Sequence, residues 1–233
     1  MTHRVVLLSL VLLAACARET IPVVEETSPS PLPAASYEAA AAGAQVYRVL
    51  PGKSLLLVHV GRDGAMKRLG HDHAIASESL QGWVELADDP NASRADLALS
   101  IRSLIVDKPA YRKRLGLDTE PTQSDIAGTY TNMLKVFQPA LYPYVQVHAR
   151  FASAQTQPPQ LVVSVALHGT SFEYLLPVQM TVSEDELVVT GEATIRHADF
   201  AVAPFRAAGG LLRVADAMDV EFRIVAIASS NVP

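Results

Sequence analysis

The feature that most constrains this chain is a strict alternation of side chains along short runs of residues. From Leu161 to Leu167, every second residue is leucine or valine. The same alternation recurs at residues 97–102, 172–180, 187–195 and 220–226. Because successive side chains of a strand point to opposite faces, these runs predict antiparallel strands separated by turns. Both faces of several runs are apolar, which fits either a sheet covered on each side or a barrel around an apolar lumen.

One segment, residues 109–138, breaks the alternation and predicts a helical insertion. Its apolar residues recur at helical spacing over 126–137, and Ser124 and Asp125 are expected to cap the helix. Pro139 is expected to mark its end. Such a helix would pack on the sheet or cover part of it.

The N-terminal residues predict a targeting signal followed by a tether. The apolar run in residues 1–15 is too short to span a membrane and is typical of a signal peptide. Leu13-Ala14-Ala15-Cys16 is typical of a lipoprotein processing site, so we expect Cys16 to be lipidated; an ordinary signal peptide with an incidental cysteine is the alternative. Residues 16–44 are rich in Pro, Ala and Ser and predict a disordered tether. Residues 45–230 have the size of one domain.

This targeting signal predicts a bacterial cell-envelope protein that faces the periplasm and is anchored through a lipid. Ala17, which is not acidic, follows the cysteine and favours the outer membrane. A net charge of −5 argues against nucleic acid as a partner, because binding it requires a basic surface. The sequence holds no nucleophile elbow and no phosphate-binding glycine loop, so we expect no enzyme activity.

A series of short landmarks follows in a fixed order along the domain. They are Leu69-Gly70-His71-Asp72-His73, Ser103-Leu104-Ile105-Val106-Asp107, Asn132-Met133-Leu134, Leu141-Tyr142-Pro143, Leu167-His168-Gly169-Thr170, Leu176-Pro177-Val178, Ala198-Asp199-Phe200 and Gly209-Gly210-Leu211-Leu212-Arg213-Val214. In order and spacing, residues 46–228 resemble the YceI-like family of bacterial periplasmic proteins. The chain departs from the better-known members of this family at two places, the pair of histidines in the first landmark and Ala201 after Asp199-Phe200. It therefore resembles a lipoprotein branch of the family.

The resemblance implies an all-β fold, an extended antiparallel lipocalin-like β-barrel of about eight strands, with the helical insertion closing part of it. It also implies a long apolar lumen that holds a polyisoprenoid chain or a related amphiphilic lipid. Alternation along the strands then predicts the residues that line the lumen and contact the ligand. They are Leu97, Leu99, Ile101, Leu161, Val163, Val165, Phe222 and Ile224.

Four histidines form the strongest polar candidates. They are His71, His73, His168 and His197. Imidazole is a common ligand for metals and for haem iron, so convergence of three or four would create a metal or haem site. Contact with a ligand head-group is a second possibility. A third is a structural role, in which His71 and His73 fix a turn by hydrogen bonds to Asp72, to Asp199 or to the backbone.

These observations predict a lipid-anchored binding protein that carries an apolar molecule and needs no cofactor. One alternative is a redox or storage protein with a histidine-based metal or haem site. Another is a non-catalytic envelope adaptor that docks a partner protein on the barrel surface. The sequence carries no signal for the oligomeric state.

Overall fold

The computed structural model describes residues 31–40 and 43–229. The predicted signal peptide at 1–15, the lipidated Cys16 and most of the predicted tether lie outside these ranges. Within them, no helix has the length and apolar character needed to cross a membrane.

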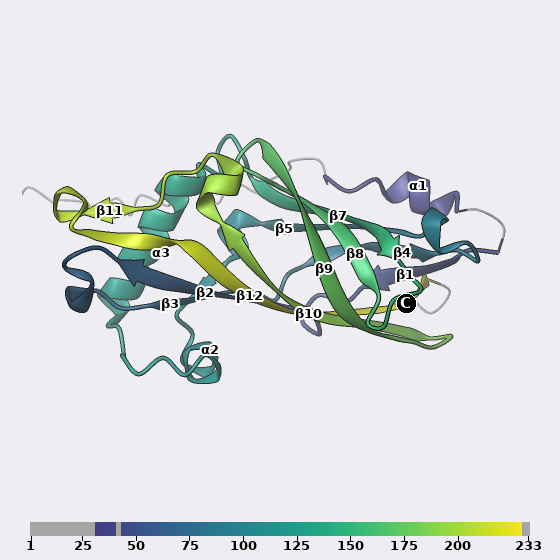
Figure 1. Ribbon diagram of the computed structural model, residues 1–233, viewed down its shortest axis with the longest axis horizontal. Helices are drawn as coiled ribbons and strands as arrows, with labels where there is room; N and C mark the ends of the chain where they lie inside the picture. The colour runs from purple at the N-terminus through teal and green to yellow at the C-terminus, as the bar shows by residue number, and fades with distance from the viewer. Residues whose placement is uncertain (1–30, 41–42, 230–233) are drawn as a thin grey trace, which may run out of the picture.

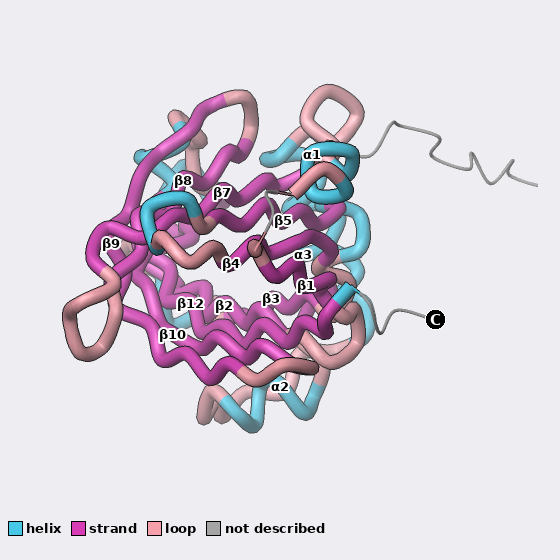
Figure 2. The backbone as a smooth tube through the Cα atoms, turned by 90° about the vertical axis from the view of Figure 1, so that its right-hand side faces the viewer, coloured by secondary structure: helices cyan, strands magenta, loops and turns pink. Residues whose placement is uncertain are grey.

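Eight antiparallel strands close into an elongated barrel (Figures 1 and 2). In spatial order the strands are β1 (Gln45–Val49), β4 (Gln81–Leu86), β5 (Arg94–Ser100), β7 (Tyr144–Ser153), β8 (Gln160–Leu167), β9 (Thr170–Val182), β10 (Glu186–Arg196) and β12 (Leu212–Ala228). Pairing of β12 with β1 closes the circle, from Tyr47 opposite Ala228 to Val49 opposite Ala226. Closure leaves no free edge around this part of the sheet, and the predicted barrel is confirmed.

Three of the barrel strands are broken and continue as second pieces toward one end. The pieces are β2 (Leu55–Asp63), β3 (His73–Ser77) and β6 (Ile105–Val106). β2 continues the line of β1 along β12, and the break between them stays hydrogen-bonded. The Leu50 N–H donates to the Val225 carbonyl at 2.8 Å, and the Val225 N–H donates to the buried Ser54 hydroxyl at 3.0 Å. The breaks therefore lengthen the barrel without leaving these backbone groups unsatisfied.

The helical insertion lies where the sequence predicts it. It forms α2 (Pro109–Arg114) and α3 (Gln123–Phe137). The cap of α3 differs from the prediction, because Thr122 and not Ser124 is the N-cap. The Thr122 hydroxyl accepts from the Asp125 N–H at 3.2 Å, and the Asp125 carboxylate accepts from the Thr122 N–H at 2.9 Å, which makes a reciprocal capping box. Residues of α3 line a cavity inside the barrel, so this helix covers the end to which β2, β3 and β6 extend (Figure 1).

The structure also departs from the predicted tether. Residues 34–38 form a short helix, α1 (Ala34–Glu38), that packs on the outside of the barrel at its other end (Figure 1). Tyr37 is buried, stacks on Trp83 with ring centroids 6.0 Å apart, and donates to the Asp96 carboxylate at 2.8 Å. Residues 34–38 are therefore packed on the barrel, because the aromatic ring of Tyr37 supplies an apolar contact that the Pro, Ala and Ser content of the segment does not predict.

Candidate binding site in the barrel lumen

The interior of the barrel is hollow along much of its length. It holds two cavities of about 210 and 230 Å³. They share the lining residues Leu56, Val58, Leu99, Val145, Val165 and Ile195. The two cavities adjoin along these shared walls, and their volumes together reach the range of small-molecule pockets.

All eight residues predicted to line the lumen do so. Leu97, Leu161, Val163, Phe222 and Ile224 line the first cavity, Ile101 lines the second, and Leu99 and Val165 line both. Their contact with a ligand stays a prediction. Close packing inside the barrel also requires a glycine in β10, since a Cβ on Gly191 would come within 2.6 Å of the Phe222 ring.

Sequence reasoning missed the inward faces of β7 and α3. β7 contributes Val145, Val147 and Phe151 to the lumen. The sequence carries a signal for β7, because apolar residues alternate with polar ones over 145–151. The lumen residues of α3 include Thr129 and Asn132, which no apolar pattern could reveal.

The two ends of the lumen differ in polarity. The first cavity is lined by apolar side chains apart from Ser93, Arg94 and Arg150. The second cavity, beneath α3, adds His73, His197, Thr129 and Asn132 to its apolar wall. The site therefore offers a long apolar tube with hydrogen-bonding groups at the covered end.

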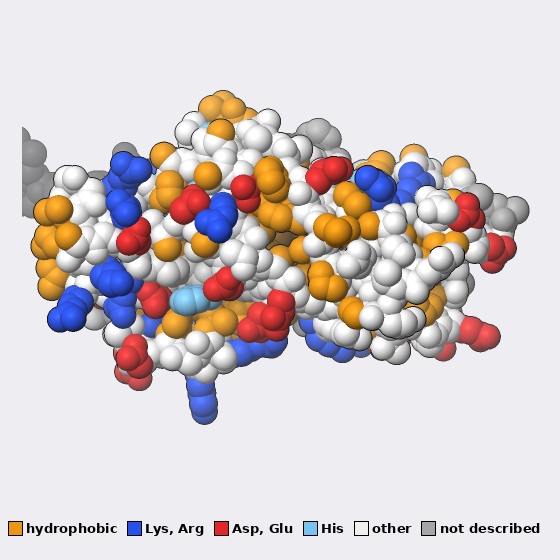
Figure 3. All heavy atoms as spheres, viewed as in Figure 1, with side chains coloured by type: hydrophobic (Ala, Val, Ile, Leu, Met, Phe, Trp, Pro, Cys, Tyr) orange, Lys and Arg blue, Asp and Glu red, His pale blue; other side chains and the backbone are white. Residues whose placement is uncertain are grey.

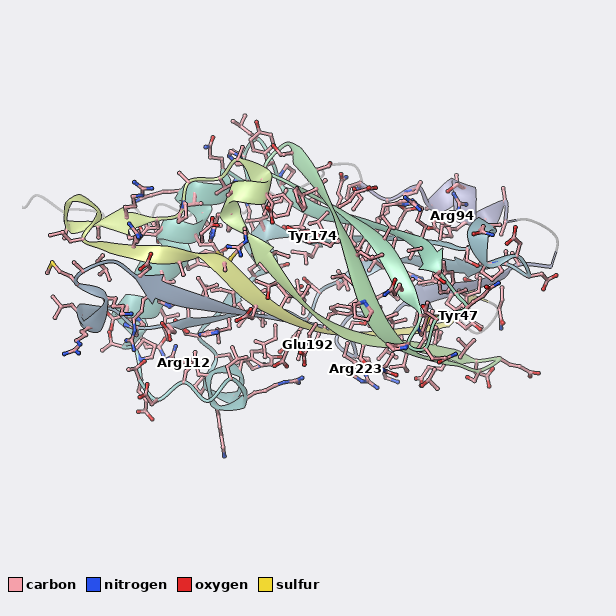
Figure 4. The ribbon with its side chains drawn as sticks, viewed as in Figure 1. Tyr47, Arg94, Arg112, Tyr174, Glu192 and Arg223 are labelled. Atoms are coloured by element: carbon pink, nitrogen blue, oxygen red, sulfur yellow. The ribbon has the colours of Figure 1, made fainter. Side chains whose placement is uncertain are left out.

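His73 is held in place by a buried charged network. Its Nδ1 lies 2.7 Å from the Asp107 carboxylate, which also accepts from Arg112 at 2.6 Å and from the Ala74 N–H at 2.9 Å. The Arg112 side chain points to this network from α2 (labelled in Figure 4) and is buried, as is Asp107. Burial alone would raise the pKa of Asp107, but the hydrogen bonds from His73, Ala74 and Arg112 outweigh it and lower that pKa. With Nδ1 against the carboxylate, Nε2 is the ring nitrogen of His73 that stays free.

The four candidate histidines do not form one site. His71 and His73 lie together, with ring centroids 4.8 Å apart, and form with Asp107 a group whose ligand atoms lie within 4.8 Å of one another. His197 stacks on Phe137, and its Nδ1 lies 3.2 Å from the Asp216 carbonyl. His168 sits in the turn after β8 against Tyr142. Neither His168 nor His197 belongs to the His71 group.

One feature of the His71 group favours metal binding and another opposes it. The Nε2 of His71 is buried without a partner, and neutral imidazoles of this kind are metal ligands. Both oxygens of Asp107, however, are already engaged, one of them by the Arg112 guanidinium. This carboxylate is therefore arranged to orient His73, as the carboxylates behind metal-binding histidines do, and is a poor direct ligand.

No protein-family model and no curated protein matches the sequence. Among solved structures, the chain is similar to BcnA of Burkholderia cenocepacia, with 13% identity, coverage of 76% of this chain and 98% of that chain, and a TM-score of 0.51. It also aligns with the YceI protein of Campylobacter jejuni, with 12% identity, coverage of 64% and 81%, and a TM-score of 0.44. Sequence identities of 12–13% show similarity of fold alone. The match to BcnA and the closed antiparallel barrel establish that the chain has the lipocalin-like barrel fold implied by its resemblance to the YceI-like proteins.

Proposed function

We propose that this chain is a non-catalytic binding protein that holds an apolar molecule, most simply a polyisoprenoid lipid, inside its barrel. The observation that carries the proposal is the pair of adjoining cavities in the lumen, whose walls are apolar over most of their length. Burial of apolar surface in such a tube contributes roughly 25 cal/mol per Å² before the ordering costs of binding. A chain of linked apolar units suits an elongated tube better than a compact ligand does.

The polar end of the lumen suggests how the ligand is oriented. Its head-group would lie beneath α3, near His73 and Asn132, while the apolar tail extends toward Leu97 and Leu161. Hydrogen-bonding groups at one end of an apolar pocket fix the direction of an amphiphile without adding much to its affinity.

The place of action forms part of the same proposal. Leu13-Ala14-Ala15-Cys16 favours a lipid-anchored protein of the cell envelope that faces the periplasm. An anchored carrier would meet its ligand at the membrane, where lipids of this class are found. Mass analysis of the mature N-terminus tests the anchor independently of the lumen.

The ligand is tested by native mass spectrometry of the full chain purified from bacterial envelopes, followed by organic extraction. The proposal expects an adduct that denaturation removes and an extract that contains a long-chain isoprenoid. Protein that carries no adduct and does not take up added isoprenoids would contradict it. That result would instead favour the adaptor role.

A second candidate function is a metal protein, favoured by the closeness of His71, His73 and Asp107. A divalent transition metal would take the free nitrogens of the two histidines, with Asp107 behind His73. Elemental analysis after zinc or copper is added decides this candidate. Metal that remains bound in a His71→Ala, His73→Ala variant at the level of the unmodified chain would exclude it.

A further inference from the structure

Two hairpin tips lie side by side at the end of the barrel beyond α3 (left in Figure 1). One joins β2 to β3, and the other joins β11 (Arg206–Ala207) to β12. The Met66 N–H of the first donates to the Leu211 carbonyl of the second at 2.9 Å. Gly64 makes this approach possible, because a Cβ there would come within 2.3 Å of the same carbonyl oxygen. The two tips are therefore locked together into one surface.

This surface exposes large apolar side chains. Leu69, at one tip, is 73% exposed, and Leu211, at the other, is 48% exposed. Phe205, just before β11, is 37% exposed. Orange side chains are visible at this end of the molecule, with basic side chains beside them (Figure 3). Leu69 and Leu211 make no contribution to the core of the barrel, and they lie on two hairpin tips that are hydrogen-bonded to each other, so a binding role better explains their position.

The same tips are strongly basic. Residues 62–70 and 205–213 hold five arginines and lysines and one aspartate, a net charge of +4, in a chain whose net charge is −5. Lys67, Arg68 and Arg206 are exposed, whereas Arg213 pairs with the aspartate, Asp63, at 2.6 Å and Arg62 pairs with Asp72 at 3.4 Å. Three exposed basic side chains on the same tips as the exposed leucines are complementary to an anionic lipid surface, which offers phosphates outside and hydrocarbon beneath.

The tips also stand beside the second cavity, at the end of the lumen that α3 covers. Val60 in β2 and Val214 in β12 line the second cavity. Val60 lies two residues before the first tip range, and Val214 lies one residue after the second. Phe205 lines that cavity and is exposed to solvent as well. The apolar wall of the lumen is thus continuous with the exposed apolar surface of the tips.

We propose that the paired hairpin tips, formed by residues 62–70 and 205–213, dock on an anionic lipid bilayer so that this end of the lumen faces the membrane. Docking rests on the proposed function only for its purpose, the transfer of an apolar molecule between bilayer and lumen. Leu69 and Leu211 would enter the interface, and the basic side chains would lie at the level of the phosphates.

A fluorescent label placed at one tip tests this proposal. Cys16 is the only cysteine, so the full chain with Cys16→Ser and Leu211→Cys has a single labelling site and no lipid anchor. The matched control carries Leu175→Cys, at a leucine of β9 that is 58% exposed and far from the tips in sequence. With vesicles that contain phosphatidylglycerol, an environment-sensitive label at 211 should shift to the blue and the label at 175 should not. Equal shifts, or no shift at 211, would overturn the proposal.

Charge reversal provides a second readout. Lys67→Glu with Arg68→Glu should weaken partitioning onto the vesicles by about 25-fold or more at low salt, since each basic residue near an anionic surface contributes a factor of about five. Lys113→Glu with Arg114→Glu, on α2, is the matched control and should change it much less. Equal losses in the two variants would contradict docking through the tips. Lipid recovered from a protein that fails both tests would overturn docking while leaving the proposed ligand intact.

Discussion

Asp107 offers the sharpest test of how the polar end of the lumen is built. Its side chain is fully buried, and that of its partner Arg112 is 6% exposed. An Asp107→Asn variant keeps the size of the side chain and tolerates the positive φ of 52° at this position, but it removes the charge opposite the guanidinium. An unpaired charge buried in this way costs about 3–5 kcal/mol. For a domain of this size, that loss lowers Tm by roughly 6–20 °C, at 2–4 °C per kcal/mol.

Chemical and thermal denaturation of the full chain measure the effect of this change. The control is Asp63→Asn, whose carboxylate pairs with Arg213 at the surface, so its loss should destabilise the chain much less than the loss of Asp107. A second variant, Asp107→Asn with Arg112→Met, should recover part of the stability because the buried charge is gone. The reasoning is refuted if Asp107→Asn costs less than about 1 kcal/mol or if the double variant is no more stable than the single one.

Three further predictions concern the lumen, the acid sensitivity and the docked helix. Leu176→Trp, inside the lumen, should displace bound lipid, whereas Leu175→Trp on the outer face of the same strand should not, as measured by the extracted lipid per protein. Burial lowers the pKa of His197, so below about pH 6.5 the unfolded chain binds a proton at this residue more readily than the folded chain does. The free energy of unfolding should therefore fall between pH 7 and pH 5, by up to about 1.4 kcal/mol per pH unit. In His197→Gln this contribution disappears, and the measured decline should be shallower. Tyr37→Ala should release α1 and raise protease cleavage within 31–40, whereas an unchanged cleavage rate would mean that Tyr37 does not hold it.

Much of the fold follows from periodicity that is visible in the sequence. The run at 187–195 alternates strictly and becomes β10, whose odd-numbered residues from Leu187 to Ile195 face the lumen apart from the glycine. The breaks at 50–54 and 78–80 could not be predicted in the same way. They depend on partners distant in sequence, such as Val225 for Leu50 and Ser54, and local composition holds no trace of them.

The candidate site divides along the same line. Inward-facing residues could be predicted because parity within a strand fixes the face of each side chain. The role of His73 could not be predicted, since Asp107 lies 34 residues away and belongs to the loop between β6 and α2. His168 lies apart from the other candidate histidines because it belongs to the turn between β8 and β9, where Gly169 fits against the Tyr142 ring. A spacing of two residues identified one histidine pair, but only tertiary contacts decide which groups meet.

The central claim, that the lumen binds an apolar chain, is tested most directly by calorimetry on the delipidated full chain. Farnesol, a 15-carbon isoprenoid alcohol, is titrated at several temperatures. Burial of roughly 450 Å² of apolar surface, taken from its carbon count, predicts a heat-capacity change of about −0.2 kcal/mol/K. Saturable binding with a negative change of this size, abolished by Leu176→Trp and kept in Leu175→Trp, is the expected result. No saturable heat at any temperature, or binding equal in both variants, would contradict the account.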